Sequence, residues 1–185
     1  MKKLLYWLSA RRPCRLIHSG NQRYLERYYL GQLFGLTFYL HRFVAADGDR
    51  ALHDHPWRMC LGICLAGGYR ERRLRWLDPE KGLDCVIRQV RPGAFNWISA
   101  STFHQIESVR KETWTLFIHT RKIKQWGFIE KVGHSREGDT TSITPVYVSD
   151  RDTSSHRQWW KTAPSGAQAD RAPLNLASES PVTDN

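Results

Sequence analysis

Short runs of aromatic and aliphatic residues, separated by turn residues, follow one another along most of the chain. Their length and their content of aromatic and β-branched residues are typical of β-strands. The expected strands are 24–30, 36–44, 57–65, 69–76, 85–90, 95–98, 103–109 and 113–119. No helical spacing of apolar residues persists after residue 22. Many short strands between turns predict an all-β sandwich or barrel.

The two ends of the chain differ from this middle part. Residues 1–22 are basic around a short apolar stretch, which predicts an N-terminal basic arm or a short helix. Residues 23–150 hold the expected strands and form the predicted domain. In the C-terminal segment, 151–185, large apolar side chains almost disappear after Lys161. Such a composition cannot repay the entropy of ordering, so it predicts a disordered tail after about residue 161.

The charge of the chain favours anionic partners. Twenty-eight Lys and Arg against eighteen Asp and Glu give a net charge of +10. A nucleic acid, an acidic membrane surface and a small phosphorylated or carboxylated molecule would all suit this charge. No nucleic-acid-binding motif accompanies it, so a nucleic-acid partner is expected from net charge only. No apolar run approaches the ~20 residues of a membrane span.

The N-terminus and the cysteines indicate the compartment. Residues 4–8 are apolar and follow two lysines, as in a signal peptide, but the stretch is short and runs into Arg11, Arg12 and Pro13. The four cysteines form no Cys-x-x-Cys pair, which argues against a four-ligand structural zinc site. We therefore expect a reduced, cytoplasmic protein.

Residues 52–57, Leu-His-Asp-His-Pro-Trp, carry the strongest chemical signal. In an extended backbone alternate side chains share a face, so His53 and His55 point together and Asp54 points the other way. Two imidazoles at this spacing can reach one metal ion, and imidazole suits zinc, copper, iron and nickel. A third ligand must come from a distant strand, and His104 is the candidate. The sequence therefore predicts a metal site of three histidines.

These residues resemble the two motifs of the cupin superfamily, whose members are metal-binding double-stranded β-helix (jelly-roll) barrels. The first motif has a His-x-His pair and a later glycine, here His53, His55 and Gly67. The second motif has Pro-Gly before a strand and a ligand histidine after it, here residues 92–93 and His104. The resemblance covers roughly residues 36–120 and implies a single jelly-roll barrel with one divalent metal. The string His-Asp-His-Pro-Trp is similar to that of small cupin-like proteins of bacteria and phages.

The chain departs from the usual cupin pattern at Cys60, where most cupins place a glutamate ligand. Three histidines without that carboxylate are similar to the cysteine-dioxygenase branch of the superfamily. The alternative for Cys60 is a small core residue in an apolar strand. Glu71, on the next expected strand, is a candidate for a further ligand or for a hydrogen-bond partner of a ligand. Its alternative is a surface ion pair among the surrounding arginines.

Substrate-binding candidates lie on several expected strands. Arg70 and Arg72 share one face, and guanidinium groups in a barrel mouth would bind carboxylate or phosphate. The alternative is a solvated sheet face. Trp97 and Trp114 are candidates to line a pocket, although aromatic residues of β-barrels also form core. His119 is a candidate to contact substrate, with a histidine at the exposed end of a strand as the alternative.

Together these features predict a metal-dependent cupin enzyme that acts on a small anionic metabolite. The resemblance makes a non-haem Fe(II) oxygenase, of the dioxygenase type of oxidoreductase, the first expectation. Zinc, manganese or nickel are alternative metals. The alternative functions are a metal-dependent isomerase or epimerase and a non-catalytic cupin ligand-binding module. Because cupins often pair through edge strands, we also expect a homodimer.

Overall fold

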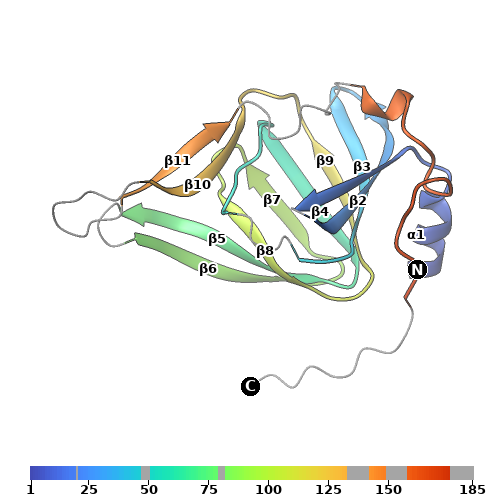
Figure 1. Ribbon diagram of the computed structural model, residues 1–185, viewed down its shortest axis with the longest axis horizontal. Helices are drawn as coiled ribbons and strands as arrows, with labels where there is room; N and C mark the ends of the chain where they lie inside the picture. The colour runs from blue at the N-terminus through green and yellow to red at the C-terminus, as the bar shows by residue number, and fades with distance from the viewer. Residues whose placement is uncertain (20, 47–50, 79–81, 133–141, 149–157, 176–185) are drawn as a thin grey trace, which may run out of the picture.

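Regular structure in the described parts of the chain is almost entirely β-strand. The computed structural model describes residues 1–19, 21–46, 51–78, 82–132, 142–148 and 158–175 (Figure 1). The elements are α1 (Lys2–Ser9), β1 (Cys14–Ser19), β2 (Gln22–Leu33), β3 (Leu36–Phe43), β4 (Met59–Ala66), β5 (Tyr69–Asp78), β6 (Gly82–Val90), β7 (Phe95–Ser99), β8 (His104–Val109), β9 (Thr113–His119), β10 (Trp126–Val132), β11 (Ser142–Val148) and the short 3-10 helix η1 (Trp159–Lys161).

The strands form one large antiparallel sheet and two smaller antiparallel units. The large sheet has the order β1-β2-β3-β9-β4-β7, the second sheet has the order β6-β5-β8, and β10 pairs with β11. In Figure 1, α1 and the described C-terminal segment lie together at one end, and β5, β6, β10 and β11 extend toward the other. This all-β, antiparallel arrangement is the jelly-roll architecture that the sequence predicted, so the predicted fold class is confirmed.

Each strand predicted from the sequence corresponds to an observed strand, from β2 to β9. The prediction missed β1, β10 and β11. β1 forms a hairpin with β2, with Arg15 opposite Arg27, so the expected domain boundary at residue 22 falls inside a paired hairpin. The basic arm therefore ends before β1. No helix among the described residues is long and apolar enough to cross a membrane.

Part of the hydrophobic core lies between the large sheet and α1. Leu5 of α1 packs into a buried cluster with Tyr28, Leu40 and Trp114 from the outer face of the sheet. The rings of Tyr28 and Trp114 stack with their centroids 6.2 Å apart. α1 is short, and it is held by burying one apolar side against the sheet, since helices of this length are marginal alone.

The chain after residue 161 corrects the expected start of the disordered tail. The backbone N–H groups of Gly166 and Ala167 donate to the carbonyls of Arg12 and Ala10 at 2.9 and 2.8 Å. Further along, the Ala172 N–H donates to Glu26 Oε1 at 2.6 Å. Composition misled the prediction because backbone hydrogen bonds and buried charges, not large apolar side chains, hold residues 162–175. Residues 176–185 lie outside the described residues.

A buried ion cluster fixes this C-terminal segment to the sheet. Arg42 pairs with Glu26 at 3.2 Å and with Glu112 at 2.5 Å, and all three side chains are at most 3% exposed. Arg42 also donates to the carbonyls of Ala172 and Pro173 at 2.6 and 2.8 Å. The two carboxylates and the guanidinium thus compensate one another away from water, and the segment completes their hydrogen bonding.

Replacing Arg42 by methionine is expected to lower the free energy of unfolding by about 3–5 kcal/mol, because two buried carboxylates lose their cation. Urea unfolding of the full chain measures the change. Arg70→Met is the matched control, since Arg70 is 51% exposed and pairs only at the surface with Glu107. Its expected cost is below about 1 kcal/mol. Equal effects of the two substitutions would contradict the role given to the cluster.

Candidate metal centre

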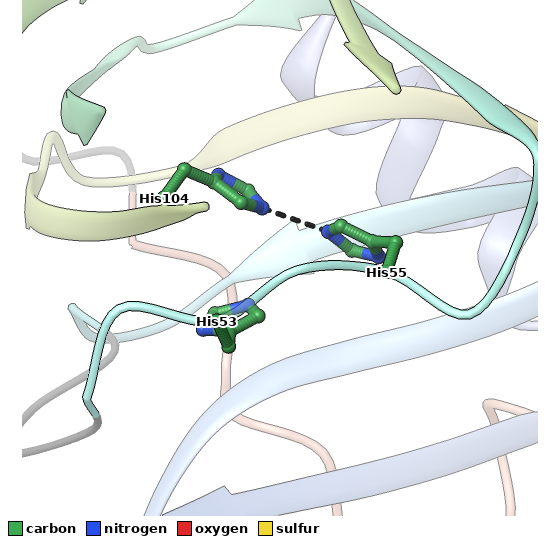
Figure 2. A group of neighbouring side chains, drawn as sticks. All are labelled: His53, His55 and His104. Atoms are coloured by element: carbon green, nitrogen blue, oxygen red, sulfur yellow. Dashed lines mark hydrogen bonds between the residues drawn. The ribbon is translucent and has the colours of Figure 1, made fainter. Parts of the chain in front are cut away.

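Three histidines from two distant parts of the chain meet in the barrel interior. His53 and His55 lie between β3 and β4, and His104 begins β8. One ring nitrogen from each lies within 4.8 Å of the others, and all three side chains are buried. Figure 2 shows His55 and His104 facing each other, with His53 beside them; the two Nε2 atoms are 2.8 Å apart. The structure thus brings together the side chains that the sequence predicted as ligands.

Backbone pairing on two sides holds the segment that carries His53 and His55. The N–H of His53 donates to the His104 carbonyl at 3.0 Å, and the His104 N–H returns a bond of 2.9 Å. Asp54 is fully buried on the opposite side, as the alternation predicted. Its carboxylate accepts hydrogen bonds from the Gly127 N–H at 2.8 Å and from the Lys124 ammonium. Asp54 therefore anchors the segment to β10 and does not join the histidines.

A buried carboxylate on β5 orients the third histidine. Glu71 Oε1 lies 2.7 Å from His104 Nδ1 and accepts the Asn96 amide at 3.0 Å. Oε2 accepts the Arg73 Nε–H at 2.8 Å. Burial alone would raise the pKa of Glu71, but the bond from His104 and the charges of His104 and Arg73 lower it to about 2. The ionised carboxylate accepts a hydrogen bond from Nδ1–H of His104, so the proton stays on Nδ1 and Nε2 is the nitrogen with the lone pair.

The donor set fits a divalent metal. Burial, with His104 and His53 beside it, lowers the pKa of His55 well below its usual range, so its imidazole is neutral, as a ligand must be. His55 Nδ1 is a buried atom without a hydrogen-bond partner among the described residues. Neutral imidazoles of this kind suit iron, zinc, copper and nickel.

Cys60 lies outside the three-histidine group. It stands on β4 in a buried cluster with Tyr39, Ile98 and Phe117. Burial raises the pKa of Cys60 to about 12. The thiol therefore stays protonated, and a thiol in that form is a poor metal ligand. Its position corresponds to the core residue that the sequence analysis gave as the alternative, and Glu71 is the carboxylate near the histidines.

Four of the substrate candidates do not lie in the interior with the histidines, which corrects that expectation. Arg70 and Arg72 are about half exposed on the outer side of β5, where both pair with Glu107. Trp97 is 55% exposed on β7, and Trp114 is fully buried in the core cluster beneath α1. Alternation along β5 correctly placed Arg70 and Arg72 on the face opposite Glu71. It could not determine which of the two faces points into the barrel.

His119 does lie inside the barrel, where its ring stacks on Trp57 with centroids 4.1 Å apart. The interior also holds polar residues that sequence reasoning missed. Arg27 Nε donates to His41 Nε2 at 3.1 Å, and the His41 ring stacks on Phe117 at 4.8 Å. No motif marks Arg27 or His41. Their only sequence signal is the alternation along β2 and β3, which places them on the inner face in register with each other.

A surface cavity of about 450 Å³ lies elsewhere, between β1 and the C-terminal segment. Its lining includes Cys14, Arg15, Leu16, Trp159 and Asp170, and none of the three histidines. It belongs to the seam where the two ends of the chain pack together.

Comparisons with known proteins give similarities of fold. No protein-family model matches the chain, and no curated protein sequence matches it significantly. One solved structure that matches is hydroxypropylphosphonic acid epoxidase from S. wedmorenis, with 15% identity over 60% of this chain and 55% of that chain and a TM-score of 0.43. KdgF from Halomonas sp. matches with 13% identity over 60% of this chain and 88% of that chain and a TM-score of 0.39. The DMSP lyase DddQ from Ruegeria pomeroyi matches with 15% identity over 60% of this chain and 56% of that chain and a TM-score of 0.45.

The chain spans little more than half the length of the epoxidase and of the lyase. With TM-scores below 0.5, the matches say nothing of what this chain binds or converts.

Acid is expected to destabilise the fold through its buried neutral histidines. Burial lowers the pKa of His119 to about 4, whereas an unfolded histidine takes up its proton near pH 6.5. The contribution of this group to stability is therefore complete above pH 6.5 and is lost as the pH falls toward 4. For His119 alone the loss is about 2 kcal/mol at pH 5.

Urea unfolding of wild type and His119→Asn at a series of pH values measures this effect. Asparagine keeps an N–H donor near the position of Nδ1, which lies 2.7 Å from the Thr120 carbonyl, and does not titrate. The variant should lose less stability than wild type between pH 7 and 5. An unchanged pH slope would show that His119 is not held neutral by the fold.

Proposed function

We propose that this chain is a metal-dependent cupin enzyme in which His53, His55 and His104 hold one divalent metal. The observation that carries the proposal is the meeting of these three buried imidazoles beside Glu71, which orients one of them. Carboxylates that accept the second ring N–H of a metal-binding histidine fix its tautomer and make it a better ligand. A lone pair held toward two other imidazoles is what a metal site requires.

The proposed metal is Fe(II), and the proposed reaction class is oxygenation of a small anionic metabolite, of the dioxygenase type. When bound, iron with three protein ligands supplies open positions at which substrate and O₂ can meet. The chain itself shields the site: Trp57, Phe117 and Trp126 surround the His55 ring with centroids 5.1 to 5.9 Å away. Such an apolar shell limits the access of water and tunes the metal. Zinc, manganese or nickel on the same histidines would instead favour an isomerase or epimerase.

Three further side chains keep Glu71 in place. Arg73 donates to Glu71 and also to Asn96 Oδ1 at 2.6 Å. Asn96 donates to Glu71 and to the Tyr69 hydroxyl, each at 3.0 Å. Because every member of this network is hydrogen-bonded, the carboxylate is rigid where it meets His104. Glu71 therefore acts as a positioning residue.

We assign the anionic part of the substrate to Arg27. This half-buried side chain on β2 lies on the inner face, with its guanidinium 5.2 Å from the centre of the Tyr39 ring. Ring contacts from His41 to Phe117 and from Phe117 to His55 connect it to the histidines. Arg15 is its register partner on β1, which places a second guanidinium on the same face. Guanidinium groups match carboxylate and phosphate geometry.

A non-catalytic ligand-binding module is the second candidate, and one distance favours it. The 2.8 Å between His55 Nε2 and His104 Nε2 also suits a hydrogen bond from one imidazole to the other. Since Glu71 holds the proton of His104 on Nδ1, the donor would be His55 Nε2–H. The barrel would then bind its ligand without a metal.

Two broader expectations stay predictions. Binding of a nucleic acid is expected only from the net charge of +10, because the sequence contains no recognised nucleic-acid-binding motif. Phosphate binding of that kind would weaken steeply with salt. A cytoplasmic location is expected from the cysteines and the N-terminus alone.

Elemental analysis of untagged protein tests the metal site. We expect stoichiometric iron in wild type and its loss in His55→Ala and His104→Ala, because each substitution removes a ligand. His18→Ala should keep the metal, since His18 is exposed on β1. Glu71→Gln should weaken metal binding about 10–100-fold. Glu107→Gln, which removes a carboxylate from the surface of the same small sheet, should leave it unchanged.

Iron present in wild type and lost in His55→Ala and His104→Ala would justify a screen of O₂ consumption with amino acids, thiols and phosphorylated metabolites. Zinc or manganese at the same level would shift the reaction to Lewis-acid chemistry. If the protein contains no metal and takes up none on reconstitution, the enzyme proposal fails and the binding module stands.

The role of Arg27 is tested with inorganic phosphate at low salt. Phosphate should raise the melting temperature of wild type, and Arg27→Gln should bind it at least about 10-fold more weakly, because a charged hydrogen bond is lost. Arg72→Gln is the control, since Arg72 is 46% exposed and pairs with Glu107. Equal weakening in both variants would mean that phosphate responds to net charge and not to the interior site.

A further inference from the structure

The helix α1 buries one side against the sheet and exposes large apolar side chains on the other. Leu5 and Ser9 are the buried side, at most 9% exposed. Leu4, Trp7 and Leu8 follow one another at three- and four-residue spacing, so they share the outward side of the helix. They are 57%, 53% and 39% exposed. In Figure 1, α1 lies on the outside of one end of the molecule, so this apolar side faces away from the barrel.

Basic residues border this apolar side. Residues 1–19 contain five Lys and Arg and no Asp or Glu, so they supply half of the net charge of +10. Lys3 lies one helical turn before Trp7 and Arg11 one turn after it, and both are exposed. The Arg11 guanidinium is 3.7 Å from the centre of the Trp7 ring, so a cation and an indole reach the surface together. We call Lys3, Leu4, Trp7, Leu8, Arg11 and the exposed Arg12 the α1 outer face.

The turn between β8 and β9 adds positive charge beside the start of α1. The Lys2 ammonium donates to the Lys111 carbonyl at 3.4 Å, which brings this turn next to the helix. Lys111 and its neighbour Arg110 are both exposed. Cations from two distant parts of the chain therefore gather around the α1 outer face.

The acidic residues close to α1 in the described part of the chain have cations of their own. Glu26 and Glu112 are at most 5% exposed, and both pair with Arg42. Asp170, on the C-terminal segment beside α1, pairs with Arg23 at 2.9 Å. These carboxylates therefore leave the α1 outer face positive.

We propose that the α1 outer face binds the surface of an anionic lipid bilayer, with α1 lying in the plane of the interface. Interfacial helices bury an apolar side about 5–10 Å deep at the boundary of headgroups and acyl chains, and carry Lys and Arg for the anionic headgroups. Tryptophan suits this depth, because its ring is apolar and its N–H is polar. Each Lys or Arg close to an anionic leaflet strengthens binding roughly 5-fold.

The combination of apolar and basic side chains favours lipid over a nucleic acid. Phosphates of a nucleic acid would pair with Lys3, Arg11 and Arg12, but would leave Leu4 and Leu8 in water. An anionic bilayer takes both kinds of side chain, because headgroup phosphates lie directly above the acyl chains. Both groups on the α1 outer face thus find a partner of their own chemistry.

The α1 outer face is fixed to the barrel before it meets a membrane. Leu5 packs against Tyr28 and Trp114, and the carbonyls of Ala10 and Arg12 accept backbone hydrogen bonds from the C-terminal segment. The apolar stretch after two lysines, which is similar to the start of a signal peptide, is therefore part of the folded domain. The proposal depends neither on a bound metal nor on the proposed enzyme activity.

Co-sedimentation of the full chain with lipid vesicles tests the proposal. Wild type should bind vesicles of equal parts phosphatidylglycerol and phosphatidylcholine, and should bind phosphatidylcholine alone at least about 10-fold more weakly. Trp7→Ser should weaken binding to the anionic vesicles at least about 5-fold, because the indole no longer enters the interface. Trp7→Phe, which keeps an apolar ring, should restore most of it. Trp97→Ser is the matched control, since Trp97 is 55% exposed on β7, and it should bind like wild type.

The basic residues are tested in the same way. Lys3→Gln and Arg12→Gln should each lower the affinity for the anionic vesicles about 5-fold. Arg75→Gln removes the same charge from a side chain that is 67% exposed on β5, a strand that extends away from α1 in Figure 1, and should have little effect. Circular dichroism checks that each variant is folded, which is expected because the substituted side chains are exposed.

Wild type that fails to bind the anionic vesicles, or that binds phosphatidylcholine alone as tightly, would overturn the proposal. Equal losses in Trp7→Ser and Trp97→Ser would overturn it, as would equal losses in Lys3→Gln and Arg75→Gln, which would reduce binding to net charge. Duplex DNA is the competing probe. If it displaces the vesicles and binds wild type and Trp7→Ser equally well, the α1 outer face belongs to a nucleic acid and the proposal fails.

Discussion

The reciprocal backbone pair between His53 and His104 is the constraint on which the site depends. Each residue donates its N–H to the carbonyl of the other, at 3.0 and 2.9 Å. The two bonds join the segment before β4 to the start of β8. The side chains of His53 and His104 therefore extend from neighbouring backbones to the same side. His55 follows on that side because of the alternation of extended backbone. The convergence of three imidazoles is therefore set by the backbone, before any metal or proton stabilises it.

Among the described residues, buried carboxylates and their cations form compensated clusters on either side of the large sheet. Inside the barrel, Glu71 is matched by Arg73 and by the hydrogen bond from His104. On the outer side, Arg42 lies between Glu26 and Glu112 and reaches the C-terminal segment. A buried charge is costly unless it is paired and hydrogen-bonded, so each cluster fixes the elements around it more strictly than apolar packing does. The inner cluster orients a histidine, and the outer one holds the end of the chain.

The sequence predicts the middle of the fold well because hydrophobic alternation and turn residues report it directly. The strands from β2 to β9 and the shared face of His53 and His55 follow from short-range patterns, whereas His104 joins them through the resemblance to the second cupin motif. The C-terminal segment does not, because its order depends on carboxylates of Glu26 and Glu112 that lie far away in the chain. Alternation separated Arg70 and Arg72 from Glu71, but only tertiary structure determines which face is inward. Arg27 and His41 carry no motif, so their meeting in the interior depends on register alone.

A metal and a proton compete for the same two nitrogens. With a proton between His55 and His104, the pair is closed by a hydrogen bond. With a metal on both Nε2 atoms, the proton of neutral His55 would instead sit on Nδ1, which has no hydrogen-bond partner among the described residues. Glu71 has the same effect in both states, because it keeps the proton of His104 on Nδ1 and the lone pair on Nε2. The low pKa of His55 keeps a second proton out of the group. The proposed binding module and the proposed enzyme are thus two states of one site, and the buried network around Glu71 keeps the lone pair of His104 on Nε2 in both.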